Sequence, residues 1–145
     1  MSDNIRKQIR DHYLTVLSGN TVAGTRVTTK RQRSQDQDRM PAISIITGDA
    51  VVDVLAMGNP PPLTHDLEVV FQCFSIGIDI DDQLDAISAE VHALVVSNVP
   101  GFVISFDLQN TNTAVDLSAD RTGGSIALTY SLVYHTPGND LTVAL

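Results

Sequence analysis

The residues best suited to chemistry in this sequence are four aspartates that lie close together in the middle of the chain. They are Asp79, Asp81, Asp82 and Asp85. Carboxylate oxygens are the ligands that divalent cations such as Ca²⁺ and Mg²⁺ prefer. The cluster also stands at the expected start of a helix, where the helix dipole favours negative charge, and no glycine turn or bidentate glutamate completes a calcium loop. We therefore interpret it as helix capping, and keep a small metal-dependent enzyme as an alternative hypothesis.

The four histidines do not have the spacing of a metal site or a catalytic dyad. They are His12, His65, His92 and His135. His65 and Asp66 are neighbours on an expected strand, so their side chains point to opposite faces. The sequence also has no nucleophile elbow, phosphate-binding loop, His-Glu-x-x-His or Cys-x-x-Cys motif. We expect packing or surface roles for the histidines, and we predict no catalytic residue, no metal ligand and no cofactor.

Basic residues are concentrated near the start of the sequence. Residues 1–39 hold eight of the nine lysines and arginines and have a net charge of +4, whereas residues 40–145 have a net charge of −12. Opposite charges on two parts of one chain favour association between copies. The total of −8 argues against nucleic acid as the main partner, because binding phosphate requires a positive surface. The charge distribution favours an assembly protein over an enzyme.

The bulk features predict one soluble, intracellular domain spanning residues 1–145. Cys73 is the single cysteine, which excludes an internal disulfide, and its apolar neighbours indicate a small buried side chain. No apolar run approaches the ~18 residues that a membrane span needs, so no membrane partner is expected. The N-terminal segment MSDNIRKQIR lacks the apolar stretch of a signal peptide.

Hydrophobic periodicity predicts an α+β domain. Helical spacing of apolar residues indicates helices over 3–17 and 80–97, with Ser2 capping the first. Alternating and β-branched residues indicate strands. The expected strands are 25–31, 42–47 with a bulge or break at 48–49 and a β-prone continuation, 65–76, 102–108 with Phe102, Ile104, Phe106 and Leu108 inward, and 125–135. This order predicts one mostly antiparallel sheet with two main helices packed on it.

Two stretches are expected to be covered by other parts of a structure. The second face of strand 65–76 turns apolar toward Phe74 and Ile76, which predicts cover on both faces by a helix or a neighbouring subunit. The final residues, LTVAL, are apolar and are expected to dock on another surface.

Two loops have compositions suited to binding. Residues 31–41, RQRSQDQDRMP, are densely polar and suit a salt-sensitive contact with another protein. Residues 57–64 contain three consecutive prolines, which cannot take part in a central sheet ladder and form a stiff loop.

Four stretches then follow one another in a familiar order. They are the strand entry Met40-Pro41-Ala42-Ile43, the strand LEVVFQCFSI, the helix DDQLDAISAEVHALV, and the closing pair FVISFDLQNT and GSIALTYSLVYHT. In this order they resemble the tail terminator (tail completion) proteins of long-tailed bacteriophages, the family of the phage lambda tail terminator. The resemblance covers roughly residues 3–136.

The resemblance implies a structural protein of the virion. Such proteins form a hexameric ring on the last ring of the tail tube, stop its polymerisation, and offer the other face to the head or neck. The implied partners are copies of the chain, the tail tube protein and a head or neck connector protein. The implied location is the tail–head junction, after assembly in the host cytoplasm.

By loop position, these contacts are expected on a set of basic, acidic and proline residues. They are Arg26, Lys30, Arg31, Arg33, Asp36, Asp38, Arg39, Pro60, Pro61 and Pro62. Three alternatives remain open: another phage head–tail joining or tail-tube-like protein, the metal-dependent enzyme, and a small adaptor or immunity-type binding protein.

Overall fold

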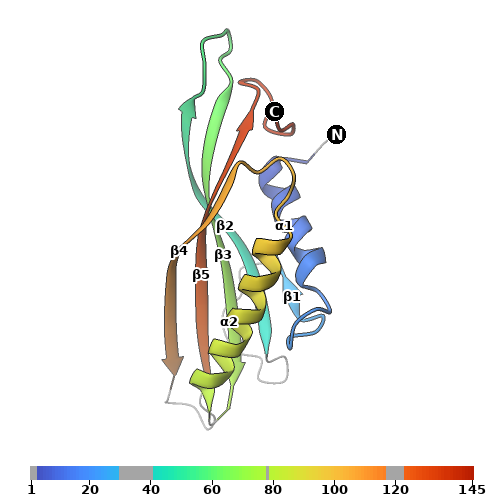
Figure 1. Ribbon diagram of the computed structural model, residues 1–145, viewed down its shortest axis with the longest axis vertical. Coiled ribbons are helices and arrows are strands. Elements are labelled where there is room, and N and C mark those ends of the chain that lie inside the picture. Colours follow the sequence, from blue (N-terminus) through green and yellow to red (C-terminus); the bar gives the residue numbers. More distant parts are fainter. Residues whose placement is uncertain (1–2, 30–40, 78, 117–122) are drawn as a thin grey trace.

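The fold is an α+β domain with two helices and one five-stranded sheet (Figure 1). The computed structural model describes residues 3–29, 41–77, 79–116 and 123–145. The elements in chain order are α1 (Ile5–Leu17), β1 (Val27–Thr28), β2 (Ala42–Val54), β3 (Leu63–Ile76), α2 (Ile80–Ser97), β4 (Ser105–Asp116) and β5 (Gly123–Thr136). The predicted fold class is confirmed.

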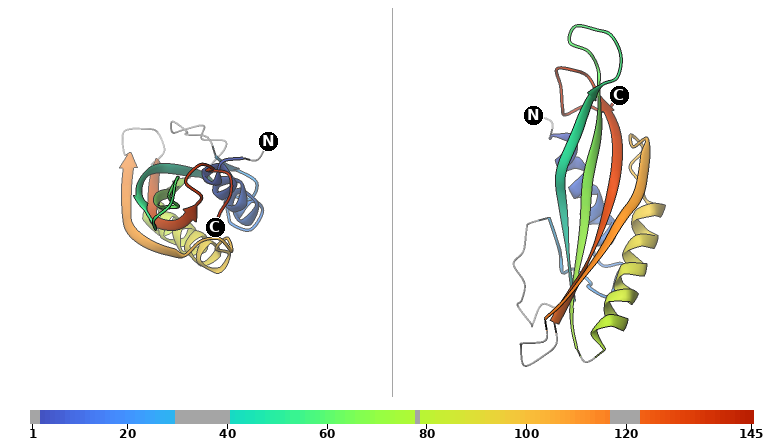
Figure 2. Two further views of the ribbon diagram at one scale, coloured as in Figure 1. Left: turned by 90° about the horizontal axis from the view of Figure 1, so that it is seen from above. Right: turned by 90° about the vertical axis from the view of Figure 1, so that its left-hand side faces the viewer.

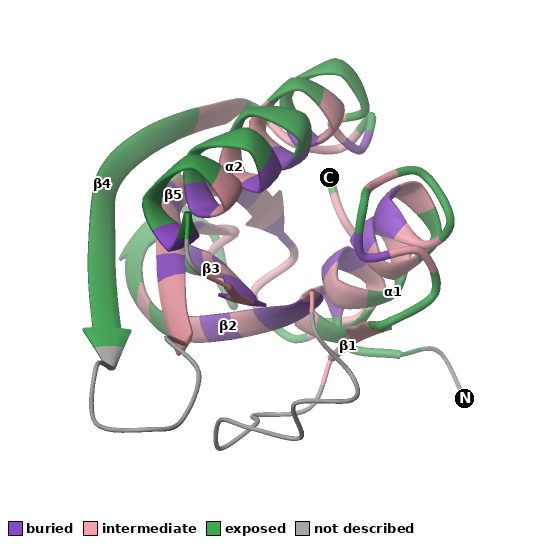
Figure 3. Cartoon of the chain, turned by 90° about the horizontal axis from the view of Figure 1, so that it is seen from below, coloured by how far each residue is buried: buried purple, intermediate pink, exposed green. Residues whose placement is uncertain are grey.

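The sheet has the strand order β1-β2-β3-β5-β4. All neighbouring strands are antiparallel except β1 and β2, which are parallel and pair only at Val27↔Ile43 and Thr28↔Ser44. Both helices lie on one face of the sheet, which bends around them (Figures 2 and 3). The other face has no helix on it in the described part of the chain.

The core lies between the helices and the alternating inward residues of β2, β3 and β5. On α1 the buried residues recur every four positions, and α2 has a similar stripe, because that spacing keeps side chains on one helix face. They are Ile5, Ile9, Tyr13 and Leu17 on α1, and Ile80, Leu84, Ile87, Val91 and Val95 on α2. The predicted stripes are therefore confirmed, except that Val16 on α1 and Leu94 on α2, which were also expected to be buried, are only partly buried.

The start of α1 differs from the prediction. The helix begins at Ile5, and Asn4 caps it, because its side-chain Oδ1 accepts a hydrogen bond from the backbone N–H of Arg6 at 2.9 Å. The predicted cap, Ser2, lies outside the described residues. An asparagine directly before the apolar stripe satisfies a free helical N–H as well as the serine would.

Strand β2 bends at the predicted bulge and continues into a long hairpin. The pairing of β2 with β3 shifts between Thr47 and Ala50, which confirms the expected irregularity at 48–49. Beyond the bulge, the two strands carry the chain past the ends of both helices (Figures 1 and 2). We call residues 50–65 of this hairpin the arm.

Two predicted strands were wrong in extent. Strand β1 spans two residues and not 25–31. Residues 30 and 31, the end of the predicted strand, lie outside the described residues. Strand β4 spans Ser105–Asp116 and not 102–108, so it begins later than predicted and includes the polar stretch 109–113. Ile104 and Leu108, predicted to face inward, are 56% and 43% exposed, because β4 is the outermost strand and a bulge follows Leu108.

The C-terminal segment docks on α1 through its backbone, but the expected cover of its apolar side chains is only partial, since Leu141, Val143 and Leu145 are exposed. The carbonyl of Leu141 accepts a hydrogen bond from Ile5 N at 2.9 Å, and that of Thr142 accepts one from Gln8 Nε2 at 3.0 Å. Ala144 packs against the core. Phe74 is also buried, in agreement with the expected cover on both faces of that end of β3, whereas Ile76 is half-buried.

Candidate functional site

The aspartate cluster does not gather into a cation site. Asp79 precedes the first turn of α2, and its Oδ1 accepts a hydrogen bond from Gln83 Nε2 at 3.0 Å. Asp81, Asp82 and Asp85 are exposed. In residues 3–29, 41–77, 79–116 and 123–145, no three His, Cys, Asp or Glu side chains come together as metal ligands would. The metal-dependent enzyme thus loses the feature that suggested it.

Three of the histidines pack against other groups, as predicted. His65 is buried, its Nε2 lies 2.8 Å from Thr136 Oγ1, and its ring stacks on Tyr134. His92 Nδ1 lies 2.7 Å from the Tyr130 hydroxyl. The ring of His12 hydrogen-bonds the carbonyl of Asn98, next to the end of α2.

Strand β4, at one edge of the sheet, is exposed along most of its length (Figure 3). Residues 107–115 are all exposed, and β5 is the one strand that pairs with β4 in the described part of the chain. A strand edge without a partner presents a row of free N–H and C=O groups that can pair with another chain. Leu108 and Val115 add exposed apolar surface to this edge.

The opposite side of the sheet is also largely open. Strand β1 pairs with β2 only at Ile43 and Ser44. Arg6 Nη2 donates to the carbonyls of Thr47 and Gly48, and beyond them residues 49–54 of β2 have β3 on one side and, among the described residues, no strand on the other. The sheet thus has two free edges, one on β4 and one on the upper part of β2.

The sheet face that lies away from the helices is acidic. Asp66 and Glu68 of β3 alternate with core residues and are exposed there, and Asp107 lies on β4 opposite Ser131. The Ser131 hydroxyl donates a hydrogen bond to Asp66. The lysines and arginines that the structure describes lie on α1 and just before β1, namely Arg6, Lys7, Arg10 and Arg26. Such a face repels phosphate groups.

The arm carries the largest group of exposed apolar side chains. They are Val51, Val52, Val54, Leu55 and Met57. Soluble proteins rarely expose such a contiguous set unless it contacts another molecule. The sequence indicated β structure here, but exposure of both faces depends on how far the arm extends past the helices, which no local pattern shows.

The expected contact residues fall into three groups. Pro60, Pro61 and Pro62 lie in the loop of the arm, where the carbonyl of Pro62 accepts a hydrogen bond from Leu55 N at 2.8 Å. Arg26 lies at the other end of β2 and donates from Nε to the carbonyl of Pro41 at 2.8 Å. The structure therefore separates these two groups. The remaining residues, Lys30, Arg31, Arg33, Asp36, Asp38 and Arg39, lie outside the described residues.

Among the helices described, none is long and apolar enough to cross a membrane. No protein family model matches the sequence, and no curated protein matches it.

Proposed function

We propose that this protein is the structural subunit of a ring that caps the tail tube of a long-tailed bacteriophage. The ring stops polymerisation of the tube and offers its other face to the head or neck, at the tail–head junction of the virion. The sequence resemblance to tail terminator proteins motivates the proposal. One structural observation carries it furthest: the sheet has two free edges on opposite sides.

The directions of the strands suit a contact between these two edges. Strands β2, β3, β5 and β4 are successively antiparallel, so β4 runs opposite to β2. When β4 of one copy lies beside the free part of β2 in the next copy, the two strands form an antiparallel pair. This contact joins two different surfaces, so it repeats from copy to copy and gives a ring when the rotation closes.

The arm suits the contact between the proposed ring and the last ring of the tail tube. It extends beyond the helices and exposes apolar side chains, with Met57 fully exposed at the tip. Apolar side chains on a projecting hairpin can be buried against the end of a tube without altering the ring contact. An acidic sheet face opposes contact with phosphate groups, which supports a protein partner over nucleic acid in this proposal.

The size of the protein in solution tests the proposal. Light scattering and electron microscopy should show rings, alone or with tail tube protein added, and the rings should stop tube elongation. Asn112→Lys with Ala114→Lys places two charges on exposed positions of the β4 edge and should dissociate the rings, because charged edges oppose strand pairing. Ala86→Lys with Ala89→Lys adds the same charge on exposed positions of α2 and should leave them intact. A wild-type chain that stays monomeric with tube protein present would refute the proposal.

A tail-tube-like or other joining protein is the second candidate, since the same two edges would serve its rings. The tube assay separates the two. A terminator stops elongation at substoichiometric amounts, whereas a tube-like subunit is incorporated and lengthens the assembly.

A further inference from the structure

The hydrogen bonds of the β2–β3 ladder decide which backbone groups of β2 point to its free edge. In an antiparallel ladder, residues that exchange hydrogen bonds with the partner strand alternate with residues that do not. Leu55 N donates to Pro62 O at 2.8 Å, in register with the pairing of β2 and β3. Every second residue before Leu55 in the arm therefore bonds to β3, and the residues between them direct their N–H and C=O groups outward. The outward residues of the arm are Ala50, Val52 and Val54.

A bond at the other end of β2 agrees with this alternation. Ile43 N donates outward to Arg26 O at 2.9 Å, beside β1. Ile43 lies opposite Cys73 of β3, and Ala50 lies opposite Leu67. Cys73 and Leu67 are an even number of residues apart on β3, so Ile43 and Ala50 point to the same edge.

The same alternation gives the outward residues of β4. In an interior strand, successive residues bond to the two neighbouring strands in turn. Leu67 lies opposite the outward Ala50, so it bonds to Leu132 of β5. Leu132 therefore makes no ladder bond to Phe106, the residue opposite it on β4. Followed through the register of β4 with β5, the outward residues of β4 are Phe106, Leu108, Thr111, Thr113 and Val115.

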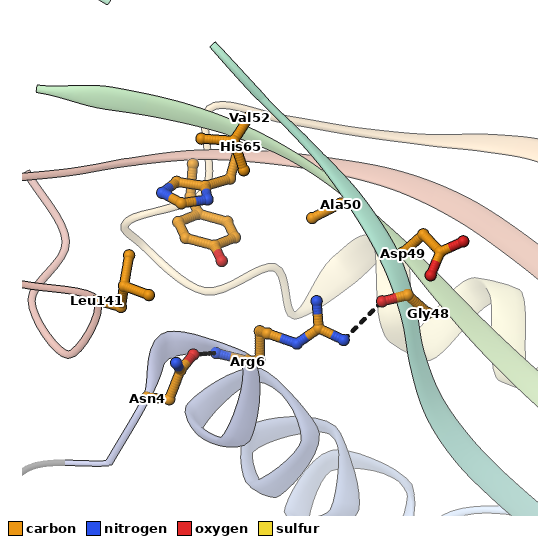
Figure 4. A pocket seen from close by; sticks show the side chains of 9 residues that line it. Asn4, Arg6, Gly48, Asp49, Ala50, Val52, His65 and Leu141 are labelled. Carbon is orange, nitrogen blue, oxygen red and sulfur yellow. Dashed lines mark hydrogen bonds between the residues drawn. The ribbon is translucent and has the colours of Figure 1, made fainter. Parts of the chain in front are cut away.

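The outward residues of both edges lie on the helix side of the sheet. Ala50 and Val52 line a hollow of about 400 Å³ at the root of the arm, beside the first turn of α1 (Figure 4). Thr113 of β4 lies opposite Ile126, a residue of the core between sheet and helices. Opposite residues of two paired strands share a face of the sheet. Strand β4 of one copy can therefore continue the sheet of the next, with the helices of both copies on one side.

Arg6 closes one end of the free edge of β2. Its Nη2 donates to the carbonyls of Gly48 at 2.6 Å and Thr47 at 3.4 Å (Figure 4). Closer to the start of β2, strand β1 occupies the edge. A strand added to this edge therefore pairs with the residues after Gly48, as far as Val54, where β2 ends.

We propose that copies of this chain join through a main-chain ladder in which Val52 lies opposite Thr113 of the next copy. Ala50 then lies opposite Val115 and Val54 opposite Thr111, and these three pairs exchange hydrogen bonds. The inference rests on the proposed ring, and it adds the register of the contact and the backbone groups that make it.

The lengths of the two edges favour this register. The free part of β2 after Gly48 ends at Val54, and the regular part of β4 begins after the bulge between Leu108 and Asn110. In an antiparallel pair the final residues of β4 lie toward Arg6. A shift of β4 in that direction would bring it against Arg6 and β1, and a shift the other way would lose paired residues.

The side chains on the far face of the sheet are compatible with this register. Val51, which is 67% exposed, lies opposite Ala114, so another apolar group covers it. Asp53 lies opposite Asn112, whose amide is a hydrogen-bond donor for the carboxylate. Asp107 lies outside the paired residues, so its charge does not oppose that of Asp53.

This register displaces neighbouring copies along their strands. Within one copy, Thr113 is level with Ile126, Cys73 and Ile43, and not with Val52. A closed ring built with this register therefore has its strands inclined to the ring axis, as strands are in a closed barrel.

Disulfide cross-linking tests the register. Val51→Cys with Ala114→Cys places two thiols on exposed positions that lie opposite each other without exchanging hydrogen bonds, the kind of pair with the closest Cβ atoms. Val51→Cys with Asn112→Cys is the matched control, because Asn112 is the next exposed residue on the same face of β4. Cys73 is buried and does not compete.

Mild oxidation of the assembled protein should give covalent oligomers at least about fivefold faster from the first pair than from the control, because a disulfide requires close Cβ atoms. Equal or faster cross-linking of the control pair would overturn the register.

Proline at an outward N–H tests the main-chain ladder. Thr113→Pro removes a donor that β5 does not use, so the monomer should stay folded in thermal unfolding. Thr113→Ala keeps the donor and loses only the side chain. Thr113→Pro should raise the protein concentration for half-assembly at least about tenfold, and Thr113→Ala less than about threefold. Equal effects of the two variants would overturn the ladder, because a side-chain contact would then explain both.

Three outcomes separate the inference from the proposed function. If wild type forms rings and neither cysteine pair cross-links, the ring stands and the inference fails. If the first pair cross-links but the rings do not stop tube elongation, the inference stands and the role at the tail fails. A wild type that never assembles, with tube protein present, refutes both.

Discussion

Gly138 lies against the backbone of Pro61 so closely that a side chain at position 138 would overlap the Pro61 carbonyl oxygen. A Cβ there would also lie 2.9 Å from Cβ of Pro60. The proline run therefore packs on the turn that follows β5, and links the loop of the arm to the C-terminal segment. The three prolines shape the arm, whatever contacts they make with another protein.

Gly138→Ala should destabilise the fold by about 1–3 kcal/mol, the usual cost of forcing an extra carbon into a filled site. The backbone oxygen of Pro61 cannot move aside as a flexible side chain would. Urea unfolding gives the free energy. Gly101→Ala is the control, since a Cβ at that position meets nothing within 4 Å, and it should change the free energy by less than about 0.5 kcal/mol. Similar losses in both variants would contradict the proposed contact.

The hydrogen bond between Tyr130 and His92 should contribute about 1 kcal/mol. The Tyr130 hydroxyl lies 2.7 Å from His92 Nδ1, and Tyr130→Phe removes it while keeping the ring stacked on Phe106, 4.6 Å away between centroids. The loss should nearly vanish in a His92→Ala background, because the partner is then already absent. Equal losses in both backgrounds, measured by chemical unfolding, would show that the two side chains do not interact.

Stability should fall in mild acid because of His65. The pKa of His65 is lowered in the fold by burial, and His135 adds to the effect. Arg6 also faces His65, because both line the hollow at the root of the arm. In the unfolded chain His65 takes up its proton near the ordinary pKa of 6.5. The stabilisation of the fold by neutral His65 is therefore complete above pH 6.5 and is lost as the pH falls below it. His65→Gln should flatten the dependence between pH 7 and 5 in urea unfolding. An unchanged slope in this variant would assign the effect to other groups.

Cys73 should be unreactive in the folded protein. It is fully buried, and burial raises the pKa of its thiol to about 12, so the reactive thiolate is scarce at neutral pH. Labelling with a thiol reagent at pH 8 should follow the rate of opening and become rapid in urea. Since the unfolded thiol ionises near 9.0, stability should decline as pH rises from there toward 12. Complete labelling within minutes under native conditions would contradict this assignment.

Local patterns sufficed for the helices and for the strands that pack on them. The buried face of α2 follows from the spacing of Leu84, Ile87 and Val91 alone, because a helix with one apolar stripe has one way to bury it. The alternation in 125–135 likewise predicted the buried face of β5. The bulge near Gly48 was also visible, as a glycine and an aspartate inside a β-prone run.

Strand β4 shows where such patterns fail. Leu108 belongs to an apolar alternation that predicts burial, yet its exposure depends on the strand's position at the edge of the sheet and on the bulge that follows it. Strand order is set by pairing between distant segments, so the two free edges, on which the proposed ring depends, carry no signature in sequence.

The sequence by itself therefore determined the two helices, most of the strands, the buried Cys73 and the uneven distribution of charge, because each follows from neighbours along the chain. Only the tertiary structure brought Arg6 of α1, His65 of β3 and Tyr134 of β5 to one hollow at the root of the arm. It also extended the arm beyond the helices. The physical reason is that sheet pairing and helix docking place residues by contacts between remote segments, which local spacing does not record.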